Sequence, residues 1–244
     1  MTAIQGFHQQ LETLHAHMNS EIRFKNAKLE ELVELSLNDL ELNLCPAVVF
    51  AVTRALQKEE LKMLSLASLF QYIFLADKIH RLVTDGDLPE QARQYPILVG
   101  DYLFGQTFLK LCEKDLHPYL REFTGLIETM NEGVIHRWSL KEKQMTLEEY
   151  KHILSKERAS VTKLAAGITA ELNGAEESVK DQLESFGYHI GMAWAFSEEG
   201  QGYAVINTYL DQARADMECL SGRCLVEPLD QLYQYVQGNL IRNN

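Results

Sequence analysis

The feature that most constrains the fold is the segment 60–83, which is apolar on nearly every face of a helix. Its large apolar side chains include Leu61, Leu64, Leu66, Leu69, Phe70, Ile73, Phe74, Ile79 and Leu82. A helix that is apolar on most sides usually lies at the centre of its bundle. The chain has only five prolines and fourteen glycines, which disfavours an all-β fold with many tight turns. We therefore expect helices packed around this central segment.

Helical spacing of apolar residues continues along the rest of the chain. It covers residues 3–36, and a new helix is expected after the break and N-cap at Asn38, running through Pro46 to about residue 56. The next expected elements are a loop at 84–89, a helix ending near residue 114, and a helix from Pro118 to about residue 138.

The C-terminal half shows the same pattern. Thr146 and Glu149 have the spacing of a capping box, and Asn173 with Gly174 is a plausible helix end. Further helices are expected at 176–197, 203–220 and 226–241. The sequence thus predicts an all-α fold with one N-terminal helical segment, residues 1–38, followed by one continuous helical domain, residues 39–244.

Composition and charge exclude several kinds of function. The formal net charge is −12, so the surface repels phosphate backbones and disfavours binding of nucleic acids. No apolar run reaches the roughly 18 residues that a transmembrane helix needs, and no secretory signal is visible. The four cysteines are scattered without zinc-site spacing. We expect a cytoplasmic protein with reduced thiols.

Three stretches stand out by their order and spacing: residues 97–105 (ILVGDYLFG), 145–150 (MTLEEY) and 186–194 (FGYHIGMAW). Together they resemble the trans-type polyprenyl diphosphate synthases. The resemblance covers residues from about 40 to 240, with one internal deletion. It implies an isoprenoid-synthase-type helical bundle in a single domain. In that family, two aspartate-rich motifs hold magnesium ions that clamp the leaving diphosphate.

Both acidic motifs are broken in this chain. The resemblance aligns the first motif with Ala76, Asp77 and His80, so that one carboxylate remains of three. It aligns the second with Glu198, Glu199 and Gly202. Asp77, Glu198 and Glu199 are therefore candidate vestigial metal ligands. The alternative for Asp77 is a solvated or N–H-bonded carboxylate at a helix end, and for Glu198 and Glu199 a solvated pair before a turn. Magnesium tolerates altered ligands poorly, because it demands near-octahedral geometry at short distances.

The basic residues that the family uses to bind substrate are also lost. Leu42 and Cys45 stand where the resemblance implies a lysine and an arginine, and Glu157 stands where it implies another lysine. The last change reverses a charge that would face the diphosphate. Lys156 and Arg158 are neighbours that could compensate as substrate-binding residues, although adjacent helical positions point about 100° apart.

These losses lead to a first hypothesis about function. The chain resembles the small, non-catalytic subunit of heteromeric hexaprenyl or heptaprenyl diphosphate synthases, which supports the activity and product length of a full-length partner. No catalytic residue and no bound cofactor are then expected in this chain, and magnesium belongs to the partner. A homodimer remains open for the chain alone. The candidate interface residues, which could also be core residues, are Tyr102, Phe104, Phe108 and Leu109.

Two alternatives stay open. One is an active magnesium-dependent prenyltransferase that uses the three remaining carboxylates. The other is an isoprenoid- or lipid-binding protein whose cavity is lined, or else filled, by Phe70, Tyr72, Phe74 and Phe108.

Overall fold

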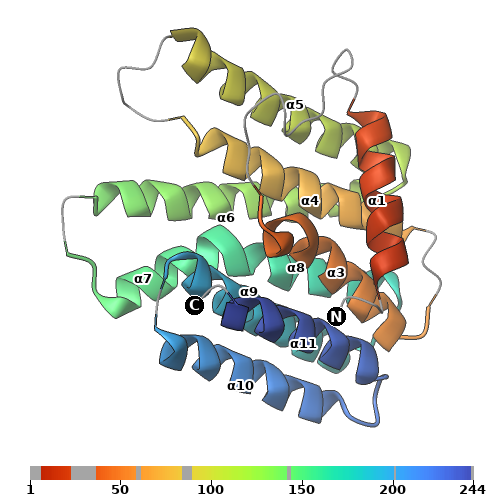
Figure 1. Cartoon of the computed structure of the whole chain (residues 1–244). Coiled ribbons are helices and arrows are strands. Elements are labelled where there is room, and N and C mark those ends of the chain that lie inside the picture. The colour runs from red at the N-terminus through yellow and green to blue at the C-terminus, as the bar shows by residue number, and fades with distance from the viewer. Residues whose placement is uncertain are drawn as a thin grey trace.

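A computed structural model describes residues 7–22, 37–58, 62–83, 90–141, 144–200 and 202–242. The described chain is a bundle of helices, which confirms the expected all-α fold class (Figure 1). The elements of the first half are α1 (His8–Glu21), α3 (Asp39–Ala55), α4 (Met63–His80), α5 (Glu90–Glu113), η2 (His117–Tyr119) and α6 (Leu120–Ser139). Those of the second half are α7 (Leu147–Leu154), η3 (Ser155–Ala159), α8 (Ser160–Leu172), α9 (Glu177–Glu198), α10 (Tyr203–Leu220) and α11 (Glu227–Arg242).

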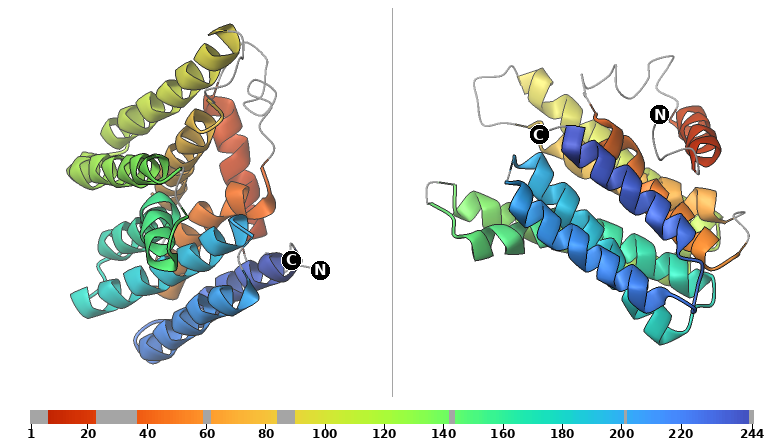
Figure 2. Two further views of the ribbon diagram at one scale, coloured as in Figure 1. Left: turned by 90° about the vertical axis from the view of Figure 1, so that its left-hand side faces the viewer. Right: turned by 60° about the horizontal axis from the view of Figure 1, so that its bottom comes forward.

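Helix α4 has the central place that its apolar sequence predicts. It packs against α1, α3, α5 and α8, and its side chains are buried on nearly all sides. The ring of Phe70 packs at a tilt against Phe123 of α6, and Phe74 lies against Trp194 of α9. Helix α5 lies at one edge of the bundle, and α10 and α11 lie at the opposite edge (Figures 1 and 2). Among the described residues, no helix has the length and apolarity needed to cross a membrane.

Local capping signals in the sequence determine where two of the helices begin. The Asn38 side chain accepts a hydrogen bond from the Glu41 backbone N–H, and the Glu41 carboxylate accepts one from the Asn38 N–H. Thr146 and Glu149 form the same reciprocal pair at the start of α7. Each pair satisfies two backbone groups that a helix end otherwise leaves without partners. Helix α8 ends before Asn173, as expected.

The structure differs from the expected elements at two places. Pro118 lies in the short 3₁₀ turn η2 rather than in the first turn of α6. The helix expected from Thr146 to Asn173 is interrupted by the π-helical turn η3, which carries three consecutive charged residues. The apolar spacing predicted after Ile22 and the loop predicted at 84–89 lie outside the described residues.

Candidate functional site

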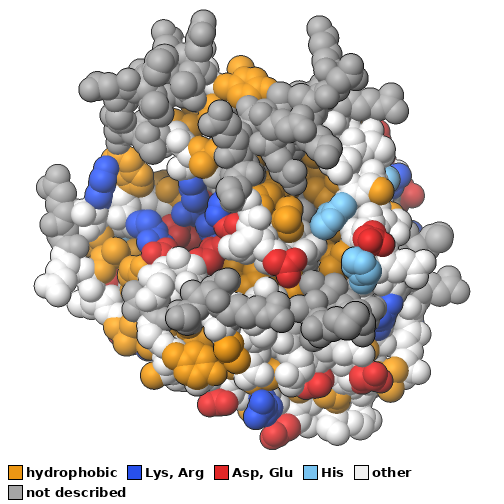
Figure 3. Space-filling model, in the orientation of Figure 1, with side chains coloured by type: hydrophobic (Ala, Val, Ile, Leu, Met, Phe, Trp, Pro, Cys, Tyr) orange, Lys and Arg blue, Asp and Glu red, His pale blue; other side chains and the backbone are white. Residues whose placement is uncertain are grey.

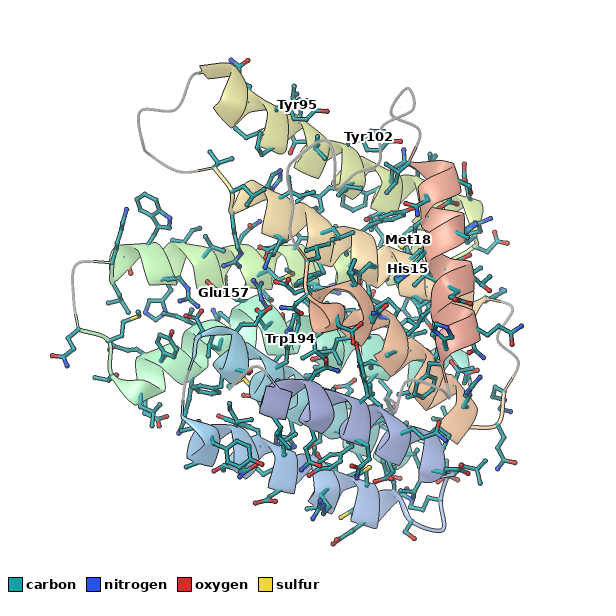
Figure 4. The ribbon with its side chains drawn as sticks, in the orientation of Figure 1. His15, Met18, Tyr95, Tyr102, Glu157 and Trp194 are labelled. Carbon is teal, nitrogen blue, oxygen red and sulfur yellow. The ribbon has the colours of Figure 1, made fainter. Side chains whose placement is uncertain are left out.

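The three candidate metal ligands, Asp77, Glu198 and Glu199, lie at one end of the bundle, where α4, α6, η3 and α9 meet. Asp77 comes from the last turn of α4, and Glu198 and Glu199 come from the C-terminal end of α9. Figure 3 shows acidic and basic side chains crowded together in a hollow in the left half of this face. Figure 4 places Glu157 in the same region, with Trp194 nearby. The fold thus brings Asp77 and Glu199, which are 122 positions apart in the sequence, to the same end of the bundle.

Arg158 lies between the two acidic positions. Its Nη1 donates to Asp77 Oδ2 at 3.0 Å, and its Nε donates to Glu198 Oε2 at 3.1 Å. The guanidinium also lies over the rings of Phe74 and Trp194, at 5.4 and 5.9 Å from their centroids. Only 8% of Arg158 is exposed, and burial by itself would lower its pKa. The charges of Asp77 and Glu198 outweigh this effect, so the pKa of Arg158 is raised above its ordinary value.

A second set of ion pairs surrounds Glu157, which is 2% exposed. Arg137 of α6 donates to both of its carboxylate oxygens, with Nη2 at 2.8 Å from Oε2, and Arg81 Nη1 lies 3.2 Å from Oε1. Arg137 Nη2 also lies 2.8 Å from Glu199 Oε1, and the Tyr150 hydroxyl donates to the same carboxylate group. Burial acts to lower the pKa of Arg137, but these carboxylates raise it overall. The charge reversal at Glu157 is thus compensated inside the protein.

The two sets are linked through Asp77, which is 6% exposed. Arg81 Nε donates to Asp77 Oδ2 at 2.8 Å, and Arg81 Nη2 donates to Oδ1 at 3.1 Å. Both oxygens of Asp77 therefore already accept hydrogen bonds from guanidinium groups. Beside them, Lys78 forms an ion pair with Glu41, and burial lowers the pKa of Lys78. We call this set the arginine cluster; its members are Glu41, Asp77, Lys78, Arg81, Arg137, Glu157, Arg158, Glu198 and Glu199.

The local backbone allows this crowding. The π-helical turn η3 places Glu157 and Arg158 side by side, both buried in the cluster. Gly133 of α6 faces Glu157 so closely that an added Cβ would lie 2.7 Å from its Cγ. Gly191 of α9 faces η3 in the same way, because a Cβ there would lie 2.7 Å from the Ala159 Cα. Two glycines thus let neighbouring helices approach the turn that carries the charges. Turns of the π-helical type often occur at functional sites.

The cluster does not fit a magnesium site. Magnesium takes six oxygen ligands at about 2.1 Å, and it is usually held by carboxylates that are free to bind it. Here Asp77 and Glu198 accept from Arg158, and Glu199 forms an ion pair with Arg137. Within the described residues, no three His, Cys, Asp or Glu side chains are arranged to hold a metal ion. A positively charged guanidinium lies where the two acidic positions face each other.

The structure separates the two residues predicted to bind substrate. Arg158 is buried in the cluster, while Lys156 turns outward and its Nζ lies 2.7 Å from Glu132 Oε2 on α6. His80, at the third position of the first motif, also turns away. Its Nε2 lies 3.2 Å from the Ile97 carbonyl oxygen and 3.4 Å from Asp101 Oδ1, both on α5. A single anion site formed by Lys156 and Arg158 is absent from this arrangement.

The aromatic residues that could have lined a cavity behind this site fill the core instead. Phe70, Tyr72 and Phe74 are fully buried, and the Tyr72 hydroxyl donates to Glu21 of α1 at 2.9 Å. Phe108 is half-buried against the core.

The candidate interface residues lie on α5. Tyr102, Phe104 and Phe108 pack partly against the core, whereas Leu109 is 49% exposed. Helical spacing places Leu109 on one face with Tyr95, Leu98 and Tyr102. Tyr95 and Leu98 are also exposed, and Figure 4 shows Tyr95 and Tyr102 on the outer helix of the bundle. Their role in an interface stays a prediction.

Sequence reasoning named Arg158 but missed the other basic residues of the cluster, Lys78, Arg81 and Arg137, and the partners of Arg158. Arg81 is four positions after Asp77, a spacing that brings two side chains together on a helix, so this pair could have been found. Arg137 is twenty positions before Glu157, and no local pattern joins them. The same holds for Arg158 and Asp77, which are 81 positions apart.

Comparison with solved structures identifies the fold. The structure superposes on a polyprenyl synthase from Caulobacter crescentus CB15, solved with calcium and isoprenyl diphosphate, with a TM-score of 0.80, 15% identity and coverage of 96% of this chain and 97% of that one. A decaprenyl diphosphate synthase from Rhodobacter capsulatus gives a TM-score of 0.77 at 14% identity, covering 99% and 98%. The geranyl diphosphate synthase small subunit from Antirrhinum majus gives 0.75 at 14% identity, covering 97% and 100%.

The chain therefore has the single-domain helical fold of the polyprenyl diphosphate synthases. In sequence, it is similar to a prenyl transferase from Cyanophora paradoxa, with 25% identity over 167 residues, which cover 63% of this chain. The match spans about half the length of that relative, 52%. No protein-family profile matches the chain.

Proposed function

We propose that this chain is the non-catalytic subunit of a heteromeric trans-polyprenyl diphosphate synthase, in which it supports the activity and product length of a full-length catalytic partner. The observation that carries the proposal is the position of Arg158 between Asp77 and Glu198. In the synthases that the chain resembles, carboxylates at these motif positions hold magnesium. Here the internal guanidinium satisfies them.

The charges of the cluster explain why catalysis by the chain alone is not expected. Ionisation of an allylic diphosphate needs cations that stabilise the departing negative charge. In this chain, the guanidinium groups of Arg81, Arg137 and Arg158 are already paired with internal carboxylates. Binding a diphosphate would require breaking those pairs and would leave buried carboxylates next to the new anion. Because of this electrostatic cost, we expect the chain to have the fold of a synthase without catalytic activity of its own.

The exposed face of α5 supports the second part of the proposal, which is contact with a partner. Tyr95, Leu98 and Leu109 are exposed on this face of the edge helix (Figure 2). Its 24 residues span about 36 Å, at 1.5 Å per residue, which is long enough for an interface of standard size. Two solved structures with this fold are named as a small subunit and as a heterotetrameric geranyl pyrophosphate synthase. We propose a cytoplasmic heteromer in which magnesium is bound by the partner.

The test is reconstitution of the activity. The purified chain is assayed with allylic diphosphate, isopentenyl diphosphate and magnesium, alone and together with a full-length synthase from the same cell. We expect no prenyl product from the chain alone, and a stable heteromer with increased turnover or altered product length when the partner is present. Turnover by the chain alone would overturn the proposal. It would also be overturned if the full-length synthase neither bound the chain nor changed its own activity in the presence of the chain.

A matched pair of variants locates the interface. Leu109→Glu introduces a charge on the α5 face, and Leu225→Glu introduces the same charge at a residue of equal exposure (49% and 48%) between α10 and α11. We expect Leu109→Glu to weaken heteromer formation at least 10-fold in light-scattering titrations, while Leu225→Glu assembles normally. If the two variants formed the heteromer equally well, this face of α5 would be excluded as the interface.

A further inference from the structure

A cavity of about 140 Å³ lies between α1, α3 and α4, apart from the arginine cluster. Its apolar walls are formed by Met18 and Ile22 from α1 and its end, by Leu37 and Leu42 around the start of α3, and by Leu75 of α4. Asn19, which is exposed, also lines it. Figure 4 shows Met18 and His15 together on α1, the helix that covers this side of α4.

Two polar atoms in the lining are buried without hydrogen-bond partners: Oε1 of Gln71 and Nε2 of His15. Gln71 is 1% exposed, and its Nε2 donates to the carbonyl oxygen of Glu41 at 2.8 Å. Because that carbonyl can only accept, the orientation of the amide is determined and Oε1 is the atom left over. Leaving a buried acceptor unsatisfied is unfavourable, and buried polar groups in folded proteins nearly always have a partner.

The lining also limits the charge of any occupant. None of the described residues that line the cavity is a lysine, arginine, aspartate or glutamate. These residues offer an ionised ligand no counter-charge for the hydration that it would lose, which favours a neutral occupant. A single water molecule that paired with the two unsatisfied atoms would leave most of the apolar walls without packing partners, because the cavity of about 140 Å³ is larger than one water. A neutral molecule with an apolar body and a hydroxyl group matches the size of the cavity, its apolar walls and its two unsatisfied atoms.

We propose that this cavity is a binding site for a small neutral alcohol with about six non-hydrogen atoms, the size of ligand that a cavity of about 150 Å³ accommodates. The ligand hydroxyl donates to Gln71 Oε1 and accepts from His15 Nε2–H, and its branched hydrocarbon part packs against the apolar walls. None of the described residues that line the cavity belongs to the arginine cluster, and the proposal does not depend on the proposed subunit role. It therefore assigns the chain a ligand of its own.

Methyl NMR of the full chain tests this directly, because Met18 is one of seven methionines and the only one among the described residues of the lining. The chain, with ¹³C-labelled methionine methyl groups, is titrated with 3-methyl-1-butanol. We expect a saturable shift of the Met18 resonance with a Kd on the order of 1 mM, within the affinity limit for so small a ligand. The resonance of Met192, which is buried in α9, should not move.

Isobutyl methyl ether, an isomer of the alcohol with the same number of non-hydrogen atoms, and two variants of the chain separate specific recognition from simple partitioning. The ether has no donor for Gln71 and should bind at least 10-fold more weakly than the alcohol. Gln71→Leu should remove this preference, and Leu75→Phe should fill the cavity and abolish the Met18 shift. Leu164→Phe, in a surface pocket near α6, is the control and should bind like the parent chain. Circular dichroism confirms that each variant is folded.

Three results would overturn the proposal: no Met18 shift at 50-fold the expected Kd, equal affinity for the alcohol and its ether, or equal shifts of all methionines. The titration involves neither a partner nor diphosphate chemistry. Its failure would thus leave the proposed subunit role untouched, and failure of the reconstitution would leave this site untouched.

Discussion

Replacement of Arg158 by methionine is the most direct perturbation of the arginine cluster. The substitution keeps an unbranched apolar side chain against Phe74 and Trp194 and removes the positive charge between Asp77 and Glu198. Removing one partner of a buried ion pair costs about 3–5 kcal/mol of stability, because the remaining charge is left buried without compensation.

The structure places this substitution near the lower end of that range. Asp77 keeps its two hydrogen bonds from Arg81, and Glu198 is partly exposed and can reach water. We therefore expect Arg158→Met to lower the free energy of unfolding by about 3 kcal/mol. For a chain of this size, that corresponds to a decrease of about 6–12 °C in melting temperature.

Thermal and urea unfolding, followed by circular dichroism, measure the effect. Lys156→Met removes the same charge two positions away, where the ion pair with Glu132 lies at the surface, and should leave the melting temperature nearly unchanged. Adding Glu198→Gln to Arg158→Met should recover at least about 1 kcal/mol, because the unpaired carboxylate is removed. The reasoning fails if Arg158→Met costs no more than Lys156→Met, or if the second substitution recovers nothing.

Further predictions concern packing, thiols and metal binding. Gly191→Ala should destabilise the chain by about 1–3 kcal/mol through overpacking against η3. Gly125→Ala, with nothing within 4 Å of the added Cβ, should be neutral or slightly stabilising, and urea unfolding compares the two variants. Burial raises the pKa of the Cys45 thiol to about 12, so at pH 8 mass spectrometry should find iodoacetamide on exposed Cys112 and Cys219, and on Cys45 only after unfolding. Magnesium with pyrophosphate should change the melting temperature of the chain alone by less than about 1 °C, because a ligand that does not bind the folded chain does not stabilise it. A clear, saturable increase would show that the cluster binds the metal.

The sequence by itself determined the helices and their order. The apolar segment 60–83 predicted the central position of α4, and the reciprocal pairs at Asn38 and Thr146 predicted where α3 and α7 begin. These features are local, since helical periodicity and capping depend on residues within one or two turns of each other. The differences from the acidic and basic motifs of the family that the chain resembles were equally visible without coordinates.

Only the tertiary structure decided what the remaining charges do. Asp77 and Glu198 could be read as vestigial metal ligands or as solvated carboxylates, and the structure instead pairs both of them with Arg158. The partnership of Arg137 with Glu157 depends on how closely α6 approaches η3, which the glycine at 133 permits. Such pairings join side chains from different helices, and their geometry follows from helix packing, which no local pattern of residues encodes.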